Sequence, residues 1–334
     1  MEATLTKKDF ESDQQVRWCP GCGDYAILAA MLKALPEMKQ KREDIVFISG
    51  IGCASRFPYY VNSYGFHTIH GRAPAIATGV KLANPNLTVW EITGDGDSLA
   101  IGGNHFIHAI RRNIDINILL FNNEIYGLTK GQFSPTSHLG LVTKSSPTGS
   151  IDPPFNPASL AMGANCTFYA RVPDTDLKLM GAVFKEAQDF KGTSVIEVLQ
   201  NCVIFNDHVH APVTDKTTKL DRQLILKHGE PMLYGENNSK GLMLKDFDLV
   251  EVVIGENGIT IDDILVHDAK TENKAIHHLL MDRKEFPYPL GVIRAVENTT
   301  YDTRMHDIIK QDKATYPYEN VQDLLESGKT WEVN

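Results

Sequence analysis

Two short polar elements have the residue types of a magnesium site that also binds phosphate. Asp95 lies between Gly94 and Gly96, and glycines on both sides of a carboxylate let the backbone approach a ligand closely. Asn123 follows further along the chain and would add its side-chain amide oxygen, with the carbonyl oxygen of Ile125 as a third ligand. One carboxylate and two neutral oxygens suit Mg²⁺, with phosphate and water oxygens completing its octahedral shell. Gly-Asp-Gly alone is usually an ordinary turn, so the prediction depends on the pairing of the two elements.

Four of the five cysteines have positions suited to metal binding or redox chemistry. Cys19 and Cys22 form a C-x-x-C pair in a Pro/Gly-rich turn, where two thiolates can reach one metal centre or act as a redox dithiol. Cys53 and Cys202 each follow a predicted strand. Four thiolates can bind zinc or a [4Fe–4S] cluster, and the spacing leaves both open. Cys166 has no partner in the pattern, so we expect it to be buried and structural.

The elements that must position these residues alternate between strand and helix patterns. Short apolar runs predict buried strands at residues 45–48, 88–92, 116–121 and 194–199. Amphipathic stretches predict helices at residues 24–35, 73–81, 103–112, 156–162 and 174–189. This alternation predicts an α/β fold with a doubly wound parallel sheet. Because ligands bind at the carboxyl ends of strands in such sheets, we expect the polar residues that follow the strands to meet at one edge.

The chain is predicted to divide into an α/β domain and an irregular C-terminal extension. The domain covers residues 1–211 and the extension covers residues 212–334, where charged, turn-rich sequence replaces the alternation. Two strand-like pieces stand out in the extension, at residues 248–254 and 258–261. Residues 132–157 are rich in Ser, Thr, Pro and Gly and predict a long loop over the site.

Composition and charge exclude several classes of protein. A chain of 334 residues with 42% hydrophobic content can bury a full core, and no apolar run approaches the roughly 20 residues that cross a bilayer. The amino-terminal segment is charged and lacks a signal-type apolar stretch, so we expect a cytoplasmic protein without a membrane partner. A net charge of −9 without a block of Lys and Arg argues against nucleic-acid binding. Five cysteines are too few for a disulfide scaffold of this length.

Four sequence motifs resemble the signatures of one enzyme family. They lie at residues 18–23 (WCPGCG), 50–53 (GIGC), 70–73 (HGRA) and 122–132 (NNEIYGLTKGQ). Together they resemble the β subunits of 2-oxoacid:ferredoxin oxidoreductases, over about residues 15–210. The Gly-Asp-Gly and Asn-Asn pair is similar to the thiamine-diphosphate fingerprint.

The resemblance implies a role for each motif. Residues that would hold thiamine diphosphate and its Mg²⁺ are Gly94, Asp95, Gly96, Asp97, Asn123, Ile125, Gly127 and Leu128. Residues that would line the cofactor are Ile51, Gly52, Cys53 and Ala54. The family uses the four positions Cys19, Cys22, Cys53 and Cys202 to ligate a [4Fe–4S] cluster.

Two further side chains have a functional and a structural interpretation. Lys130 would face the carboxylate of the substrate or of a reaction intermediate, where a cation offsets charge changes during decarboxylation. A solvated loop lysine is the structural alternative. His70 would hydrogen-bond the cofactor, or it is a structural histidine with satisfied hydrogen bonds.

The implied reaction is the oxidative decarboxylation of a 2-oxoacid, with coenzyme A as acyl acceptor and ferredoxin as electron acceptor, and it can run in reverse as a reductive carboxylation. No Glu in this chain can be identified as the carboxylate that activates the aminopyrimidine ring, and the family places it on a separate α subunit. We therefore expect an αβ heterodimer or an α2β2 assembly.

The C-terminal extension, through residues 285–292 (EFPYPLGV), looks like that of the enzymes specific for 2-oxoglutarate, with pyruvate or a broad 2-oxoacid range as the alternative. Two other classes stay open. A thiamine-dependent decarboxylase or synthase usually carries both cofactor-binding halves in one longer chain and lacks the four cysteines. A non-catalytic electron-transfer module would leave Asp95 and Asn123 without a role.

Overall fold

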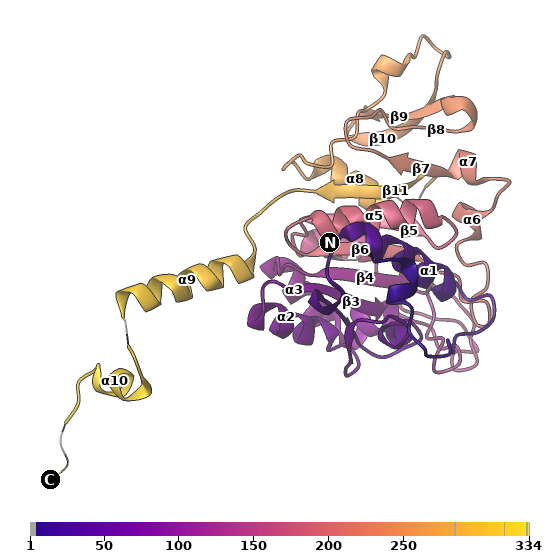
Figure 1. Cartoon of the computed structure of the whole chain (residues 1–334). Coiled ribbons are helices and arrows are strands. Elements are labelled where there is room, and N and C mark those ends of the chain that lie inside the picture. Colours follow the sequence, from indigo (N-terminus) through magenta and orange to yellow (C-terminus); the bar gives the residue numbers. More distant parts are fainter. Residues whose placement is uncertain (1–4, 284, 317, 332, 334) are drawn as a thin grey trace.

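The computed structural model describes residues 5–283, 285–316, 318–331 and 333. This part of the chain forms an eight-stranded sheet covered by helices, a small three-stranded sheet and a helical arm that extends away from both (Figure 1). None of its helices combines the length and the apolar character needed to span a membrane.

The main sheet has the strand order β2-β1-β3-β4-β6-β5-β11-β7. Its strands are β1 (Ile45–Ser49), β2 (Tyr64–His67), β3 (Thr88–Gly94), β4 (Asn117–Asn122), β5 (Phe168–Pro173), β6 (Ser194–Leu199), β7 (Gln223–Leu226) and β11 (Tyr288–Ala295). Strands β1 to β6 are parallel to one another, whereas β11 runs antiparallel to β5 and parallel to β7. The predicted doubly wound parallel sheet is confirmed.

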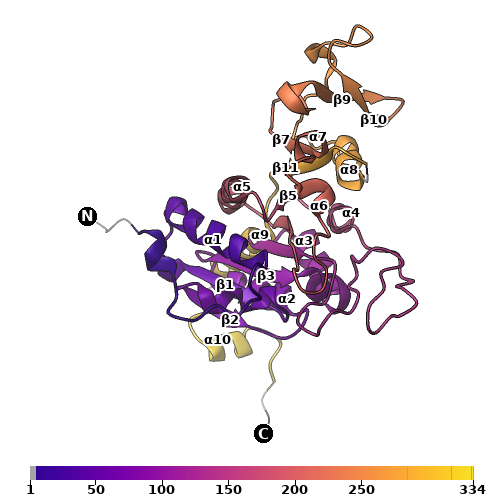
Figure 2. The same ribbon diagram turned by 90° about the vertical axis from the view of Figure 1, so that its right-hand side faces the viewer.

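Helices cover both faces of the main sheet. The large helices are α1 (Asp24–Ala34), α2 (Ala73–Ala83), α3 (Gly103–Arg112), α4 (Pro157–Gly163) and α5 (Leu177–Asp189), close to the predicted ranges. Helices α1 and α5 pack on one face, and α2, α3 and α4 pack on the other (Figure 2). Because both faces are covered, the central strands are buried along their whole length, which explains their continuous apolar runs.

Short helical turns connect the larger elements. They are η1 (Lys7–Phe10), η2 (Leu35–Met38), η3 (Arg42–Asp44), η4 (Ala54–Tyr60), η5 (Asp97–Ile101), η6 (Glu236–Asn238) and η7 (Ile261–Asp263), with α6 (Ala211–Thr214) and α7 (Lys219–Arg222). Residues 132–156 contain no helix or strand, so the predicted long loop is confirmed as a loop.

The segment after residue 211 adds to the main sheet and also forms a sheet of its own. It supplies β7 and β11, together with α8 (Ala275–Asp282). The small antiparallel sheet has the order β10-β9-β8, with β8 (Leu233–Tyr234), β9 (Lys240–Lys245) and β10 (Asp248–Val253). The strand predicted at residues 248–254 is therefore confirmed. The division of the chain at residue 211 stays a prediction.

The second strand-like piece, at residues 258–261, is not a strand. Gly255 and Gly258 both have positive φ, and the Gly255 N–H donates to the carbonyl of Ile259 at 2.8 Å, which closes a tight turn. Ile261 then begins η7. The prediction was wrong because the apolar residues of this short run alternate by chance within a turn.

The chain ends in a helical arm built from α9 (Tyr301–Thr315) and α10 (Val321–Glu326). Because β11 runs against the parallel strands, the arm leaves the sheet at their amino ends (Figure 1). At its root, the backbone N–H of Asp115 donates to the carboxylate of Asp302 at 3.1 Å.

Candidate cofactor and metal site

Loops that follow four adjacent parallel strands meet at the carboxyl edge of the sheet. Residues 50–53 follow β1, Asp95 follows β3, Asn123 follows β4 and Cys202 follows β6, and these strands are neighbours in the order β1-β3-β4-β6. Strand order thus brings together residues that are far apart in the sequence. This edge is where ligands bind in parallel α/β sheets.

Asp95 is a buried carboxylate without an ion pair among the described residues. Its Oδ2 accepts hydrogen bonds from the hydroxyls of Ser134, at 2.5 Å, and Thr136, at 2.6 Å. Burial raises the pKa of Asp95, although the two hydroxyls oppose the shift. A buried carboxylate that lacks a positive partner is suited to a bound cation, because the cation supplies the missing charge.

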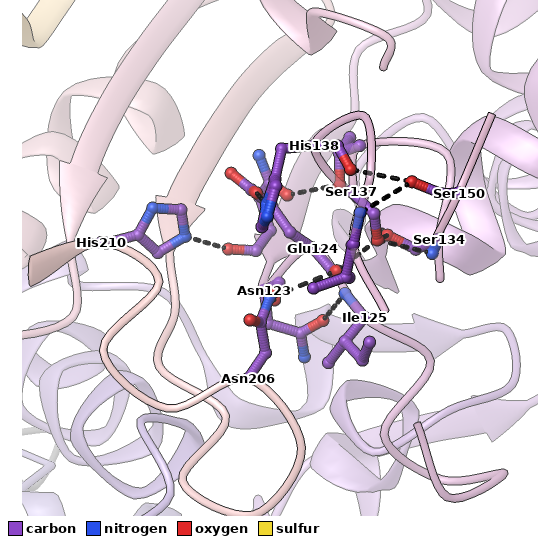
Figure 3. Close-up of polar contacts among 12 residues, drawn as sticks. Asn123, Glu124, Ile125, Ser134, Ser137, His138, Ser150, Asn206 and His210 are labelled. Atoms are coloured by element: carbon purple, nitrogen blue, oxygen red, sulfur yellow. Dashed lines mark hydrogen bonds and ion pairs between the residues drawn. The ribbon is translucent and has the colours of Figure 1, made fainter. Parts of the chain in front are cut away.

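Asn123 lies in a tight polar turn directly after β4 (Figure 3). Its Oδ1 accepts from the backbone N–H of Ile125 at 3.2 Å, and its backbone carbonyl accepts from the side chain of Asn206 at 3.0 Å. Glu124, between them, adopts a left-handed φ of 55°. Burial raises the pKa of Glu124 to about 8, with further contributions from the negative charges of Asp95 and Glu197. Glu124 therefore holds its proton at neutral pH and adds little charge beside Asp95. The carboxylate of Asp95 and the neutral oxygens of Asn123 and Ile125 fit Mg²⁺.

Asp97 joins three loops of the site to one another. Its Oδ1 accepts from the backbone N–H groups of Ile51, at 3.1 Å, and Gly71, at 2.7 Å, and also lies close to Nδ1 of His70. Its Oδ2 accepts from the hydroxyl of Thr93 at 2.9 Å. A side chain at Gly50 would clash with this carboxylate, because a Cβ there would lie 1.9 Å from Oδ2. Asp97 and His70 are thus tied into the protein framework.

Gly96 and Gly127 lie where loops of the site meet, and at Gly96 the approach leaves no room for a side chain. A Cβ at Gly96 would lie 2.2 Å from the ring of Tyr126, whose hydroxyl donates to the Gly96 carbonyl at 2.9 Å. Gly127 lies beside the cysteines, since a Cβ there would be 3.6 Å from Sγ of Cys53 and 3.5 Å from Sγ of Cys202. The backbone that follows Asn123 therefore runs between the predicted magnesium ligands and the thiols of Cys53 and Cys202.

The C-x-x-C pair forms a turn whose sequence explains its shape. The N–H of Cys22 donates to the carbonyl of Cys19 at 3.0 Å, with Pro20 and Gly21 at the two central positions. Gly21 has a φ of 84°, which a type II turn requires at this position. The N–H of Gly23 then donates to the carbonyl of Asn201 at 3.1 Å, which holds the turn against the loop after β6.

All four predicted cysteine ligands line one pocket of about 200 Å³. Cys19 is exposed, Cys22 and Cys53 are half-buried, and Cys202 is buried. Burial, followed by the nearby carboxylate of Asp24, raises the pKa of Cys53 to about 12 and raises that of Cys22 further. Within the described ranges, no three His, Cys, Asp or Glu side chains are grouped around a single ion.

Cys166 lies away from this pocket. It is buried beside β11, and its backbone carbonyl accepts from Nε of Arg294 at 2.9 Å. Burial raises the pKa of its thiol to about 12. The expectation of a buried cysteine is confirmed.

The same pocket connects the thiols to Asn123, one of the three predicted magnesium ligands. Asn123, Gly127, Leu128 and Lys130 line it together with the cysteines. Lys130 is exposed and has a left-handed φ of 78°. Ile51, Gly52 and Ala54 lie around Cys53 in the loop after β1, and Gly52 has a φ of 145° with open space where a side chain would lie. These placements suit the predicted roles, which stay predictions.

A buried polar network beneath the site was not predicted. Glu197 accepts from Nε of Arg171 at 2.6 Å, from the hydroxyl of Tyr169 at 2.7 Å and from Nδ2 of Asn122 at 2.8 Å. The Oδ1 of Asn122 lies 2.9 Å from the hydroxyl of Thr136, which also contacts Asp95. The one signal in the sequence is a charged residue inside the apolar runs of β5 and β6, Arg171 and Glu197. A strand that is buried on both faces usually keeps a charged side chain only when that side chain is paired.

The fold and the site define a thiamine-diphosphate-binding protein. A family model described as the C-terminal TPP-binding domain of thiamine pyrophosphate enzymes matches residues 50–198, which include the loops after β1, β3 and β4.

Relatives assign the family within this class. The chain is 48% identical over 332 residues to the 2-oxoglutarate oxidoreductase subunit KorB of Mycobacterium tuberculosis, covering 98% of this chain and 88% of that protein. It is 49% identical over 190 residues to the β subunit of 2-oxoacid:ferredoxin oxidoreductase 1 of Aeropyrum pernix, covering 57% and 60% of the two chains. The chain belongs to the family of 2-oxoacid:ferredoxin oxidoreductase β subunits, and the resemblance found in the sequence is confirmed.

A solved structure supports the same assignment. It is a 2-oxoglutarate:ferredoxin oxidoreductase from Magnetococcus marinus with 2-oxoglutarate, coenzyme A and succinyl-CoA bound. The two chains are 29% identical, superpose with a TM-score of 0.78 and cover 98% of each other. The shared fold therefore includes the C-terminal sheet and most of the helical arm.

Proposed function

We propose that this chain is the β subunit of a coenzyme A-dependent 2-oxoglutarate:ferredoxin oxidoreductase. The enzyme would convert 2-oxoglutarate and coenzyme A to succinyl-CoA and CO₂, pass two electrons to ferredoxin, and run in reverse as a reductive carboxylase. The observation that carries the proposal is the single pocket that joins Asn123 and Lys130 to four cysteines. A redox cluster in that pocket would lie next to the cofactor whose chemistry it serves.

Thiamine diphosphate would supply the carbanion and the electron sink. Asp95, the Asn123 side chain and the Ile125 carbonyl would hold Mg²⁺, because the buried Asp95 carboxylate lacks a positive partner among the described residues. Gly94, Gly96, Gly127 and Leu128 would let the backbone approach the diphosphate. In this arrangement Asp97 and His70 hold the loops around residues 51 and 71 in place.

The four thiolates of Cys19, Cys22, Cys53 and Cys202 would bind a [4Fe–4S] cluster. Thiols placed around a pocket of about 200 Å³ suit a four-iron cluster better than one zinc ion, which needs its ligands around a single point. Burial holds the pKa of Cys53 near 12, so the free thiol keeps its proton at neutral pH. Iron binding would replace that proton and neutralise the thiolate charge.

Lys130 would bind the substrate carboxylate. Lys130 is exposed and lines the pocket, and the described residues offer it no ion pair. A cation there would attract an anionic 2-oxoacid and offset the negative charge that moves during decarboxylation. Its replacement should therefore affect turnover more than folding.

An α subunit would complete the active site. Activation of the aminopyrimidine ring needs a carboxylate for which this chain offers no assigned candidate, and the relatives of this chain are named as β subunits. We also propose a cytoplasmic location, because the five cysteines are free thiols and a reducing compartment keeps them available for iron.

Steady-state turnover by the assembled enzyme tests the proposal. A panel of 2-oxoglutarate, pyruvate, branched-chain and aryl 2-oxoacids would be assayed with coenzyme A and ferredoxin. We expect the highest kcat/KM for 2-oxoglutarate. A higher value for pyruvate would favour the alternative substrate range, and the absence of coenzyme A-dependent oxidation with every acid would contradict the proposed reaction.

A further inference from the structure

We propose that an acidic, ferredoxin-type electron carrier docks on the exposed turn that contains Cys19. This inference rests on the proposed function, since it needs a cluster at the four cysteines. The docking surface is defined by Arg17, Cys19, Pro20, Gly21, Tyr25 and Arg56, and we call it the cysteine-turn surface. It is the place where the described protein brings a cluster ligand to the outside.

Exposure singles out this turn among the cysteine positions. Cys22 and Cys53 are half-buried and Cys202 is buried, whereas Cys19, Pro20 and Gly21 are all exposed. A cluster bound here would have its Cys19 side nearest to solvent. Because electron transfer weakens steeply with distance, a carrier that docks on this side has the shortest path.

The turn is held rigidly from beneath, so it offers a preformed surface. The indole N–H of Trp18 donates to the carbonyl of Cys53 at 2.7 Å, and the hydroxyl of Tyr25 donates to the carbonyl of Trp18 at 3.2 Å. Trp18 also packs edge-on against Tyr25, with ring centroids 5.6 Å apart. A rigid surface loses little conformational entropy when a partner binds.

Charge determines which kind of carrier fits. The chain has a net charge of −9, yet the charged residues that line the cysteine pocket are the three cations Arg17, Arg56 and Lys130 and one buried acid, Asp24. Two of these cations, Arg17 and Arg56, belong to the cysteine-turn surface, which is therefore basic on a chain of negative net charge.

The nearest exposed acid on the loop after β6 is already engaged. Asp207 accepts from the side chain of Asn201 at 2.8 Å and lies 3.4 Å from Nε2 of His208. Arg17, in contrast, is exposed, and its guanidinium makes no hydrogen bond or ion pair in the described part of the chain. A free, exposed cation beside the turn can pair with a carboxylate of the carrier.

The electron balance of the docked complex is simple. One electron passes from the reduced cluster to an oxidised carrier, no bond is made or broken, and no proton moves. Oxidation of one 2-oxoacid releases two electrons, so two carriers that each accept one electron would dock in turn. Docking must then be reversible, which suits a small surface steered by charge more than a large apolar interface.

The test compares two charge reversals in the assembled enzyme. Arg17→Glu changes the cysteine-turn surface, and Lys245→Glu makes an equal charge change on β9 in the small sheet, away from the pocket. The probe is an oxidised acidic [4Fe–4S] ferredoxin, and calorimetry measures its Kd without turnover. We expect Arg17→Glu to raise Kd about tenfold at low salt and the difference to shrink at about 1 M salt, where charges are screened beyond about 3 Å.

Turnover with two acceptors separates docking from chemistry. Arg17→Glu should slow the 2-oxoacid-dependent reduction of ferredoxin at sub-saturating concentration and leave the reduction of methyl viologen unchanged. Equal Kd values for Arg17→Glu and Lys245→Glu would overturn the docking surface. If wild-type enzyme reduced neither acceptor, the proposed function would fail, whatever the binding experiment showed.

Discussion

At the scale of residues, two buried carboxylates that are separated by one glycine have different surroundings. Asp97 receives hydrogen bonds on both oxygens from Ile51, Gly71 and Thr93, so its acceptor capacity is largely used. Asp95 receives two hydroxyl donors on a single oxygen, and burial raises its pKa. The motif G-D-G-D does not distinguish them, because the difference arises from loops distant in sequence. The structure therefore favours Asp95 as the cation ligand and Asp97 as the organiser of the loops.

We expect Asp95→Ala to abolish the binding of thiamine diphosphate and Mg²⁺ while leaving iron content nearly unchanged. The substitution removes the carboxylate assigned to Mg²⁺ and touches none of the four cysteines. Calorimetric titration with the cofactor and iron analysis of the same preparation provide the two measurements. Stoichiometric cofactor in the variant would refute the site.

Cysteine substitutions test the ligand set. Cys202→Ser should lose the cluster, because a hydroxyl is a poor iron ligand beside thiolates. Cys166→Ser is the matched control, since Cys166 is buried next to Arg294 and away from the pocket. Iron and sulfide analysis decides between them. An intact cluster in Cys202→Ser, or a lost one in Cys166→Ser, would mean that the four ligands were chosen wrongly.

At the scale of elements, the sequence predicted four buried strands, two of which carry a single acid in a mainly apolar run, Glu91 in β3 and Glu197 in β6. β5 was missed because Arg171 interrupts its apolar run, and β2 was missed because all four of its residues are exposed. Arg171 is tolerated there because Glu197 is its register partner on β6, and this pairing depends on strand order. β7 and β11 come from the segment after residue 211, and β11 pairs with β5, which lies more than 100 residues earlier; local periodicity does not encode such a contact.

The site was likewise predicted only where it depends on strand ends, and not where it depends on contacts between distant segments. The residues that follow the predicted strands were found because strand ends in a parallel sheet share one edge. The hydroxyls of Ser134 and Thr136 were missed because nothing in a Ser/Thr-rich loop indicates which of its side chains turns inward. The contribution of Glu197 was missed because its pairing with Arg171 depends on strand order.

The loop at residues 132–157 is expected to be anchored through Thr136. Its hydroxyl lies 2.6 Å from Asp95 and 2.9 Å from Asn122, and its single proton can be donated to one of them at a time. Thr136→Val keeps the shape and removes the donor, which should weaken cofactor binding by about 1–2 kcal/mol, roughly tenfold in Kd. Thr148→Val, at an exposed position of the same loop, is the control. Equal cofactor affinity in both variants would exclude the anchoring role.

β3 contains a buried acid whose titration affects stability. Both carboxylate oxygens of Glu91 are buried without a hydrogen-bond partner among the described residues. Burial, and then the charge of Asp97, raises the pKa of Glu91 well above its usual value of 4.5. The folded protein thus keeps this proton at a pH where the unfolded chain has lost it. The contribution of Glu91 to the free energy of unfolding is therefore full below 4.5 and falls as pH rises.

Glu91→Gln should remove this dependence. We expect the variant and the wild type to have similar stability near pH 5 and to diverge at higher pH. The variant would become more stable by at most about 1.4 kcal/mol for each pH unit. Denaturant unfolding of the apoprotein at several pH values measures the difference. Parallel pH profiles would show that Glu91 ionises in the folded state as it does in the unfolded chain.

At the scale of the whole molecule, the site edge and the helical arm lie at opposite ends of the parallel strands. Three large apolar side chains that line the pocket, outside the cysteine-turn surface, are exposed: Leu128 at 44%, Ile204 at 57% and Phe205 at 38% of their surface. Clustered exposed apolar residues at a functional edge indicate a surface that another chain covers. This is the face on which an α subunit would complete the active site.

The chain purified without an α subunit is therefore expected to contain the cluster and to lack activity. The four cysteines all belong to this chain and line one pocket, so the brown absorbance of an iron–sulfur cluster should be present after anaerobic purification. Coenzyme A-dependent oxidation of 2-oxoacids should be absent, because the carboxylate that activates the cofactor would come from the partner. Adding purified α subunit to the same sample should restore turnover, which separates a missing subunit from a damaged β chain. Turnover by the isolated chain would instead mean that it contains the activating carboxylate, and that the exposed apolar edge serves another purpose.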